Sequence, residues 1–247
     1  MHPVGGKNVS DLMAIFQQQA PKYDLLVSRE DYQGNLLRCL SSITPLSGKR
    51  VVEFGAGTGR LTRLLAPLVK SIEAFDAAEP MLVVAKKRLL EVGLNNWSLE
   101  VADNRKIPAR THSADLVVAA WSICCLAAYE GDHWQREVDT ALDEMRRVAA
   151  AGGKLVIIET LGTGCSSPNA PEGLRPYYDH LEKNGFSSNW IRTDYRFESM
   201  AEAIDLTTFF FGKEPIGTLE QNRDGVLLPE CTGVWSKDAV SPHLGAR

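Results

Sequence analysis

The sequence predicts an α/β fold: a doubly wound, mostly parallel sheet of seven strands, with an antiparallel last strand and an N-terminal helical cap. Three observations lead to this prediction. Short apolar strands alternate with helical segments, which is typical of a parallel sheet covered on both faces. The apolar run from Leu116 to Ala120 suits a strand buried on both sides. A chain of 247 residues, 44% of them hydrophobic, is long enough for one domain with a sizeable core.

Two helices are expected before the first strand. Leu12, Ile15 and Phe16 recur at helical spacing within residues 11–19. A second helix is expected from Ser28, because a serine can cap a helix and acidic residues fill the first turn after it. We expect these helices to fold over the mouth of a ligand site at the edge of the sheet.

The most informative segment is a glycine-rich turn between the first strand and a helix. The apolar strand contains the acid Glu53, the turn is Gly55-Ala56-Gly57-Thr58-Gly59, and the helix begins at about Thr58. Glycines allow a positive φ and let a ligand approach the backbone. A turn in this position directs backbone N–H groups and a helix N-terminus at a bound cofactor.

Three other interpretations of this turn are possible. The dinucleotide motif G-x-G-x-x-G has one more residue than the G-x-G-x-G spacing found here. The phosphate-binding motif G-x-x-x-x-G-K-[ST] does not occur in the chain. A tight turn without any ligand is the third interpretation, although three glycines in five residues would weaken such a turn with no gain in packing.

The next two strands also lead into acidic residues. Residues 71–76 predict a second strand that ends with Asp76, and residues 97–101 predict a third strand, followed by Asp103 and Asn104. An ionised carboxylate only accepts hydrogen bonds, so Asp76 can bind both hydroxyls of a ribose. A role for Asp76 as a simple helix N-cap is the alternative.

The rest of the chain predicts four further strands and two helices. The strands are residues 113–121, 154–159, 188–197 and 231–237. The helices begin near Pro176 and at Ser199, where Ser199-Met200-Ala201-Glu202 is a capping box. Residues 160–173 form a long segment rich in Gly, Ser and Pro at the carboxyl edge of the fifth strand, and a loop there is expected to close over a site.

These motifs, in this order, resemble the class I S-adenosylmethionine-dependent methyltransferases, in particular the ubiquinone/menaquinone-biosynthesis-like, small-molecule group. Residues 53–59 are similar to the family's E-x-G-x-G-x-G, residues 76–82 to its D-x-S-x-x-M-L, and residues 102–108 to its G-D-A-x-x-L-P. Ala151 stands where the family usually has a proline. The resemblance covers roughly residues 20–160.

The resemblance implies S-adenosylmethionine as the cofactor and a set of residues around it. Asp76 would bind the ribose, Asp103 would meet the adenine amino group, and Tyr23 would lie near the methionine end. Met81 either faces the adenine or is ordinary core, and packing of Tyr23 against the sheet is the alternative for that residue. The expected cofactor-binding residues are Tyr23, Glu53, Gly55, Ala56, Gly57, Gly59, Asp76, Ala77, Met81, Asp103, Asn104 and Ala120.

The chain, residues 1–247, is expected to be a single methyltransferase domain. Residues 1–45 would form the helical cap, residues 46–160 the cofactor-binding core, and residues 161–247 a substrate-side loop, helices and the final strands. The sulfonium of S-adenosylmethionine already activates its methyl group, so an in-line displacement needs mainly proximity and alignment. The catalytic residues are therefore unknown from the sequence.

The expected acceptor is a small, partly apolar molecule, and the expected substrate-binding residues lie near the fourth and fifth strands: Trp121, Glu159, Tyr177 and Tyr178. His133 is a further candidate that also suits a surface helix. The chain lacks both the Pro-Pro-aromatic motif of amino-directed base methyltransferases and a Pro-Cys dipeptide, so DNA is not an expected partner. A protein or RNA methyltransferase, or a non-catalytic cofactor-binding or partner subunit of the same fold, remains the alternative.

Charge, hydropathy and cysteine content limit the other kinds of partner and location that this chain can have. A net charge of −4 gives no indication of a phosphate-binding surface. No apolar run reaches membrane-spanning length and the first residues lack a signal-peptide pattern, so a cytoplasmic location is expected. Five cysteines without metal-type spacing predict reduced thiols and no metal site. A homodimer is compatible with these properties.

Overall fold

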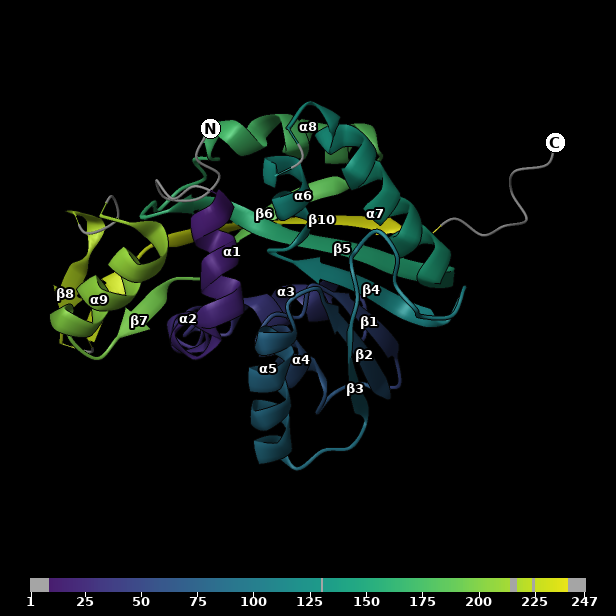
Figure 1. Ribbon diagram of the computed structural model, residues 1–247, viewed down its shortest axis with the longest axis horizontal. Helices are drawn as coiled ribbons and strands as arrows, with labels where there is room; N and C mark the ends of the chain where they lie inside the picture. Colours follow the sequence, from purple (N-terminus) through teal and green to yellow (C-terminus); the bar gives the residue numbers. More distant parts are fainter. Residues whose placement is uncertain (1–8, 130, 214–216, 224, 240–247) are drawn as a thin grey trace.

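A seven-stranded sheet forms the centre of the molecule in the computed structural model, which describes residues 9–129, 131–213, 217–223 and 225–239 (Figure 1). The strands lie in the order β3-β2-β1-β4-β5-β10-β6. Their bounds are β1 (Arg50–Phe54), β2 (Ser71–Asp76), β3 (Trp97–Val101), β4 (Ala114–Ala120), β5 (Ala149–Thr163), β6 (Ser187–Arg192) and β10 (Glu230–Asp238). Neighbouring strands are parallel except for β10, which pairs antiparallel with both β5 and β6. This confirms the predicted doubly wound sheet with its antiparallel last strand.

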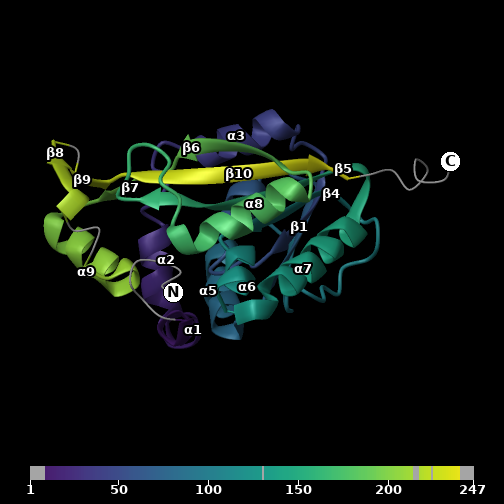
Figure 2. The same cartoon turned by 90° about the horizontal axis from the view of Figure 1, so that it is seen from above.

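Helices cover both faces of this sheet. They are α1 (Val9–Gln18), α2 (Ala20–Val27), α3 (Asn35–Ile43), α4 (Arg60–Leu65), α5 (Glu79–Val92), α6 (Ile123–Tyr129), α7 (Trp134–Val148), α8 (Arg175–Lys183) and α9 (Met200–Phe211). Side chains of a strand alternate between faces, so Leu116 and Val118 of β4 pack with α3 and α4, whereas Val117 and Ala119 pack with α6, α7 and α8. Figure 2 shows α3 and α8 on opposite sides of β10.

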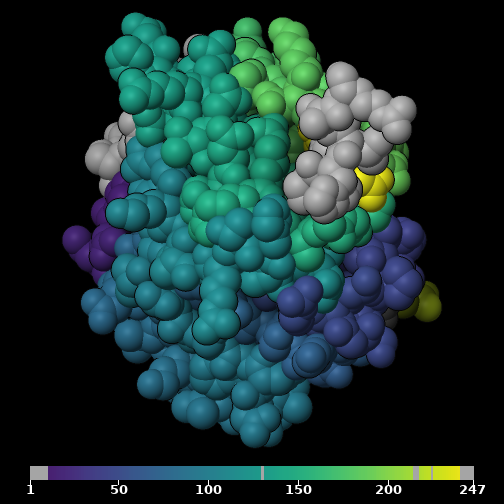
Figure 3. Space-filling view, turned by 90° about the vertical axis from the view of Figure 1, so that its right-hand side faces the viewer, coloured from purple at the N-terminus to yellow at the C-terminus, as the bar shows by residue number. Residues whose placement is uncertain are grey.

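A second group of elements, here called the cap, lies beside the sheet (Figures 1 and 2). It consists of α1, α2, α9 and a small antiparallel sheet of β7 (Tyr195–Phe197), β9 (Gly225–Leu228) and β8 (Glu220–Asn222). Arg29, just after α2, ties the two helical parts together through a 2.7 Å ion pair with Glu202 of α9. The cap therefore joins residues from both ends of the chain. Figure 3 shows the end of the molecule that faces away from the cap, where the blue and teal atoms of the core form most of the surface.

The helix predicted to start at Ser28 is wrong. Ser28 follows the last turn of α2, and its hydroxyl donates to the Leu25 carbonyl. The next helix, α3, begins at Asn35, because the carboxylate of Asp31 accepts hydrogen bonds from the N–H groups of Asn35 and Leu36. This helix packs on the sheet and belongs to the core, although the prediction placed it in the cap. Residues 1–8 of the predicted cap lie outside the described residues.

The single strand predicted over residues 188–197 is also wrong, because it divides between two sheets. β6 ends at Arg192 and pairs with β10, whereas β7 pairs with β9 in the cap. At the break, the Thr193 N–H donates to the carbonyl of Glu230 and the Arg196 N–H donates to that of Arg29. Strands β8 and β9 were not predicted.

The long loop predicted from residue 160 starts later than expected. Strand β5 continues to Thr163, because β10 runs beside it up to the Glu230–Thr163 pair. The irregular part is residues 164–171. Among the described residues, no helix is both long and apolar enough to cross a membrane.

Candidate active site

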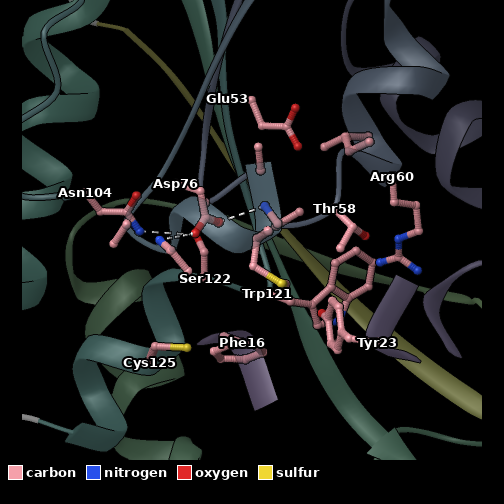
Figure 4. Close-up of a pocket in the computed structure, with 18 of the residues that line it drawn as sticks. Phe16, Tyr23, Glu53, Thr58, Arg60, Asp76, Asn104, Trp121, Ser122 and Cys125 are labelled. Atoms are coloured by element: carbon pink, nitrogen blue, oxygen red, sulfur yellow. Dashed lines mark hydrogen bonds between the residues drawn. The ribbon is translucent and has the colours of Figure 1, made fainter. Parts of the chain in front are cut away.

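A cavity of about 310 Å³ lies at the carboxyl edge of the sheet, where β1, β2 and β4 end. Ligands of open α/β sheets bind at this edge. Core residues form one wall, and Phe16 and Tyr23 of the cap form part of the other. In Figure 4, Asp76, Asn104 and Ser122 lie on one side of the cavity, and Thr58, Arg60, Trp121 and Tyr23 gather on the other.

The three glycines of the turn after β1 face three different surroundings. All have a positive φ, between 56° and 77°. A Cβ on Gly55 would lie 2.2 Å from that of Ser122, and one on Gly59 would lie 3.0 Å from that of Ala85 in α5. Gly57 has only Met81 nearby, at 3.6 Å, and lines the cavity. Gly57 thus leaves the backbone open to a ligand, while the other two permit close packing of the chain on itself.

Asp76, at the end of β2, fixes this turn. Its Oδ2 accepts a 2.7 Å hydrogen bond from the Gly57 N–H, and its Oδ1 accepts a 2.8 Å hydrogen bond from the Ala78 N–H. A carboxylate offers about four acceptor positions, so two of them remain open. Burial raises the pKa of Asp76, and the two backbone hydrogen bonds oppose that shift. The side chain holds the loop and still faces the cavity.

Asp103 and Asn104 line the cavity beyond β3. The Arg105 guanidinium donates two hydrogen bonds to the Asp103 carboxylate, of 2.6 and 2.8 Å, and these hold the pKa of Asp103 below its usual range. Arg105 also binds Glu137 of α7. Asn104 donates to the hydroxyl of Ser122, which in turn donates to the carbonyl of β1's last residue. The ends of β1, β3 and β4 are therefore linked by side-chain hydrogen bonds.

Two buried polar side chains lie at the base of the glycine turn. Glu53 is almost fully buried, and burial raises its pKa to about 8 despite a 2.6 Å hydrogen bond from the Thr62 hydroxyl. The hydroxyl oxygen of Thr58 is buried as well and has no hydrogen-bond partner among the described residues. Buried hydroxyls are normally hydrogen-bonded. Since Thr58 lines the cavity, its unpaired oxygen is available to a polar ligand.

A smaller cavity of about 80 Å³ continues from the first, toward the cap. The two cavities share six lining residues: Phe16, Tyr23, Val27, Arg60, Trp121 and Cys125. At this boundary the guanidinium of Arg60 lies over the Trp121 ring, with its Cζ 4.1 Å from the ring centroid, and forms an ion pair with the buried Glu30. Trp121 has a φ of 50°, held by a 2.7 Å hydrogen bond from its N–H to the Ile158 carbonyl.

The smaller cavity is mainly apolar and aromatic. Phe16 packs edge-to-face on Tyr23, at a centroid distance of 5.5 Å, and Tyr23 packs on Phe210 of α9 at 5.2 Å. The few polar side chains in its lining include Glu30, Thr160, Thr163, Tyr195 and Glu230. This is the usual composition of a pocket for a small organic molecule.

Comparison with known proteins bears on what the cavities hold. A family model described as a methyltransferase domain matches residues 52–157. The demethylmenaquinone methyltransferase of Thermus thermophilus is 32% identical over 151 residues, which are 59% of this chain and 64% of that protein. The ubiquinone/menaquinone biosynthesis C-methyltransferase UbiE of Burkholderia vietnamiensis is 30% identical over 59% of this chain and 58% of its own length. The chain thus matches about three fifths of the length of these curated relatives.

Together these matches support a class I S-adenosylmethionine-dependent methyltransferase. A solved structure of such an enzyme from Aquifex aeolicus matches 95% of this chain and all of its own with a TM-score of 0.55, at 18% identity. That likeness concerns the fold. The larger cavity of this methyltransferase suits S-adenosylmethionine, the cofactor of the family. Open acceptor positions on Asp76 suit ribose hydroxyls, and the unpaired Thr58 hydroxyl and exposed backbone at Gly57 supply further polar contacts.

The structure brings most of the predicted cofactor-binding residues of this methyltransferase to the larger cavity. Those that line it are Tyr23, Glu53, Gly55, Ala56, Gly57, Asp76, Ala77, Met81, Asp103, Asn104 and Ala120. Gly59 does not line it, because it faces Ala85. Met81 is buried against Ala20 and Ala78 and also lines the cavity, so contact with the adenine stays a prediction.

Of the four expected substrate-binding residues, the structure places only one at the cavities. Trp121 lies at the boundary of the two cavities, but Glu159 and Tyr177 line neither and are buried behind them, joined by a 3.0 Å hydrogen bond. Tyr178 stacks on Trp235, with ring centroids 4.6 Å apart, beside a separate surface hollow. His133 is exposed in a short 3₁₀ turn. Helix α8 buries the tyrosines because they lie on its sheet-facing side.

Sequence reasoning missed several residues that line the cavities. Ser122 and Arg60 adjoin recognised motifs, so their positions could have been inferred. The helical spacing of Phe16 predicts a helix but does not indicate that its ring lines a cavity. The contributions of Phe210 and Glu230 had no local indication, because they depend on how the distant C-terminal segments fold over the core.

Proposed function

We propose that this chain transfers the methyl group of S-adenosylmethionine to a small, partly apolar acceptor bound in the smaller cavity. The observation that carries the proposal is the junction of a polar cavity at the glycine turn with an apolar one under the cap, through six shared residues. Such a junction suits an in-line displacement, in which two bound molecules meet end to end.

When bound, S-adenosylmethionine supplies a methyl group activated by a positive sulfonium. The chain's own residues position and enclose the reactants. The rings of Tyr23 and Trp121 lie at the boundary, where aromatic faces attract a cation. Residues of the cap line both cavities, and closure of the cap on the reactants would exclude water and strengthen such electrostatic contacts.

The enclosed form of the smaller cavity supports a small molecule over a protein or nucleic acid as the acceptor. Its lining residues come from α1, α2 and α9 as well as from the core, so it lies between the cap and the sheet. The names of the curated relatives, which act in quinone biosynthesis, also support a small organic acceptor. A quinone-type ring compound is one member of this class.

Calorimetry tests the cofactor part. The chain should bind S-adenosylhomocysteine and not NAD. Asp76→Ala removes hydrogen bonds to a charged group, worth roughly 1.5–3 kcal/mol, so the affinity should fall about tenfold to a hundredfold. Glu79→Ala is the matched control, because Glu79 is an exposed acid three residues away and outside the cavity. Tight binding of NAD with none of S-adenosylhomocysteine would contradict the proposal.

Turnover tests the transfer itself. The chain is incubated with S-adenosylmethionine and pools of small organic molecules, and S-adenosylhomocysteine formation is measured. Formation that depends on one pool and is lost in Asp76→Ala supports the proposal. Formation with protein or RNA substrates alone would place the acceptor outside the smaller cavity.

A further inference from the structure

The carboxyl group of Glu230 is unusual among the polar groups of the smaller cavity. Glu230 is the first residue of β10, is 2% exposed, and lines the cavity. Its Oε1 accepts a 2.6 Å hydrogen bond from the Thr160 hydroxyl. Its Oε2 is buried and makes no hydrogen bond of ordinary geometry with any described residue. Leaving such an atom unpaired in the interior is costly, so the free oxygen calls for an explanation.

Two neighbouring acids, Glu30 and Asp194, each have several partners, in contrast to Oε2 of Glu230. Glu30 pairs with Arg60 and accepts 3.0 and 3.1 Å hydrogen bonds from the hydroxyls of Tyr195 and Thr193. Asp194 is held by two 2.8 Å hydrogen bonds from Arg192 and also accepts one from the Glu230 N–H. Glu30 and Asp194 are therefore paired within the protein, whereas Oε2 of Glu230 can still accept a hydrogen bond from a molecule in the cavity, although the Thr163 hydroxyl also acts on this carboxyl group.

We propose that Glu230 anchors the methyl acceptor, by pairing its free carboxyl oxygen with a neutral hydroxyl group on an otherwise apolar molecule. This inference rests on the proposed function, since it assumes that the smaller cavity holds the acceptor. The surrounding aromatic and aliphatic side chains, Phe16, Leu26, Phe210 and Phe211 among them, suit the apolar remainder of that molecule.

The charges around the cavity favour a hydroxyl over an ammonium group. Arg60 and Glu30 neutralise each other within the wall, so this pair supplies no net negative charge to attract an ammonium group. Burial, with the nearby Glu30 carboxylate, raises the pKa of Glu230 to about 8, while the Thr160 and Thr163 hydroxyls oppose the shift. A neutral carboxyl can both donate to and accept from a hydroxyl, so the two groups satisfy each other.

Ligand-observed fluorine NMR tests the anchor with four small probes of one ring size. The full chain, saturated with S-adenosylhomocysteine, is titrated with 4-fluorophenol, 4-fluoroanisole, fluorobenzene and 4-fluorobenzylamine. A hydrogen bond of ordinary net strength, converted to affinity, predicts that 4-fluorophenol binds about three- to tenfold more tightly than fluorobenzene. 4-Fluoroanisole can accept but not donate, so it can form at most one of these two hydrogen bonds and should bind less tightly than 4-fluorophenol.

Variants then assign the preference to Glu230. Glu230→Met keeps the length of the side chain and removes its polar end, so the preference for 4-fluorophenol over fluorobenzene should fall to about one. Glu220→Gln, at an exposed acid of β8, is the control and should keep the full preference. If Glu230→Met does not fold, the four-probe comparison in the unaltered chain still decides whether the cavity prefers a hydroxyl group.

The outcomes separate this inference from the proposed function. Equal binding of 4-fluorophenol and 4-fluoroanisole, or a preference retained in folded Glu230→Met, overturns the anchor. Tightest binding by 4-fluorobenzylamine overturns the choice of a hydroxyl. Calorimetry on the same samples reports S-adenosylhomocysteine binding: its absence would contradict the proposed function, whereas its presence without a hydroxyl preference contradicts the anchor alone.

Discussion

Single residues in the glycine turn have different roles that their shared motif conceals. Gly55 and Gly57 both line the larger cavity, but a Cβ on Gly55 would meet Ser122, whereas Gly59 lies outside the cavity and faces Ala85. The motif predicts that a ligand approaches all three, because sequence spacing carries no information on what lies opposite each glycine. The structure therefore separates an effect on binding from an effect on folding within five residues.

A pair of substitutions tests this separation. Gly57→Ala and Gly59→Ala each place a side chain at positive φ, which costs about 1–2 kcal/mol. Gly59→Ala also presses its Cβ on Ala85, whose helix must shift, so it should lower the melting temperature more. Gly57→Ala adds a methyl group at the cavity wall and should lower the affinity for S-adenosylhomocysteine more. Thermal unfolding and calorimetry measure the two effects, and the reverse ranking would contradict this assignment.

Glu159 is a buried acid whose role is structural in this arrangement. It accepts 3.0 Å hydrogen bonds from the Cys124 N–H and the Tyr177 hydroxyl, and burial raises its pKa to about 7. The unfolded chain, with an ordinary pKa near 4.3, loses this proton first. Between these two values the folded state binds more protons, so the contribution of Glu159 to stability falls as the pH rises and is constant above about 7.

Glu159→Gln should remove this dependence, since an amide oxygen can accept both hydrogen bonds without a charge. The variant should be more stable than the unaltered chain at pH 8, by roughly 4 kcal/mol at most, and about equally stable at pH 4.5. Urea unfolding at both pH values measures the difference. Glu220→Gln is the exposed control. A Glu159→Gln variant that is less stable at pH 8 would show that the carboxylate itself is needed.

At the scale of elements, the loop of residues 164–171 does not lie over the site, although its Gly, Ser and Pro content suggested a loop that closes there. None of these residues lines either cavity, and Pro168 and Ala170 border the surface hollow beside Tyr178. Strand β5 delivers Thr160 and Thr163 to the smaller cavity before the loop begins. Glycine and proline content predicted an irregular segment correctly, but composition does not say which side of the strand the chain turns toward.

Replacing residues 166–170 with a Gly/Ser linker of equal length should therefore spare both S-adenosylhomocysteine affinity and turnover. The loss of Pro168 and of the packing of Ala170 against the core should lower the melting temperature slightly, because glycine gives the unfolded chain more freedom. Replacing Thr163 with valine is the contrasting change, because that residue lines the cavity. If the linker abolishes turnover while cofactor affinity is kept, the loop contributes to acceptor binding after all.

At the scale of the whole molecule, the sequence predicted what is encoded locally. The strand ends, the glycine turn and the Ser199 capping box involve neighbours in the chain, and the capping hydrogen bond from the Glu202 N–H to Ser199 is present. The cap and the smaller cavity could not be predicted in this way. The hydrogen bond from Tyr195 to Glu30 joins residues 165 positions apart, and that from Thr160 to Glu230 spans 70. Such pairs follow from the packing of the complete fold.

Cofactor binding should be felt in both parts of the molecule. The larger cavity is lined by the glycine turn and by Phe16 and Tyr23 of the cap. S-adenosylhomocysteine should therefore slow amide hydrogen exchange both in residues 55–60 and in α1 and α2. Helix α8 lines neither cavity and is the internal control. Slowed exchange limited to the glycine turn would show that the cap does not close on the cofactor.

The junction between cap and sheet has a consequence for how new acceptor preferences arise. Strand β9 ends at Leu228 and β10 begins at Glu230, so Pro229 is the single residue between this strand of the small sheet and the last strand of the large one. A single recombination point there separates two inheritable blocks. The block before it carries the apolar lining from Tyr195 to Phe211, and the block after it carries the carboxyl group of Glu230. Exchange of the first block between related genes would alter the shape of accepted molecules while the polar contact stays in place.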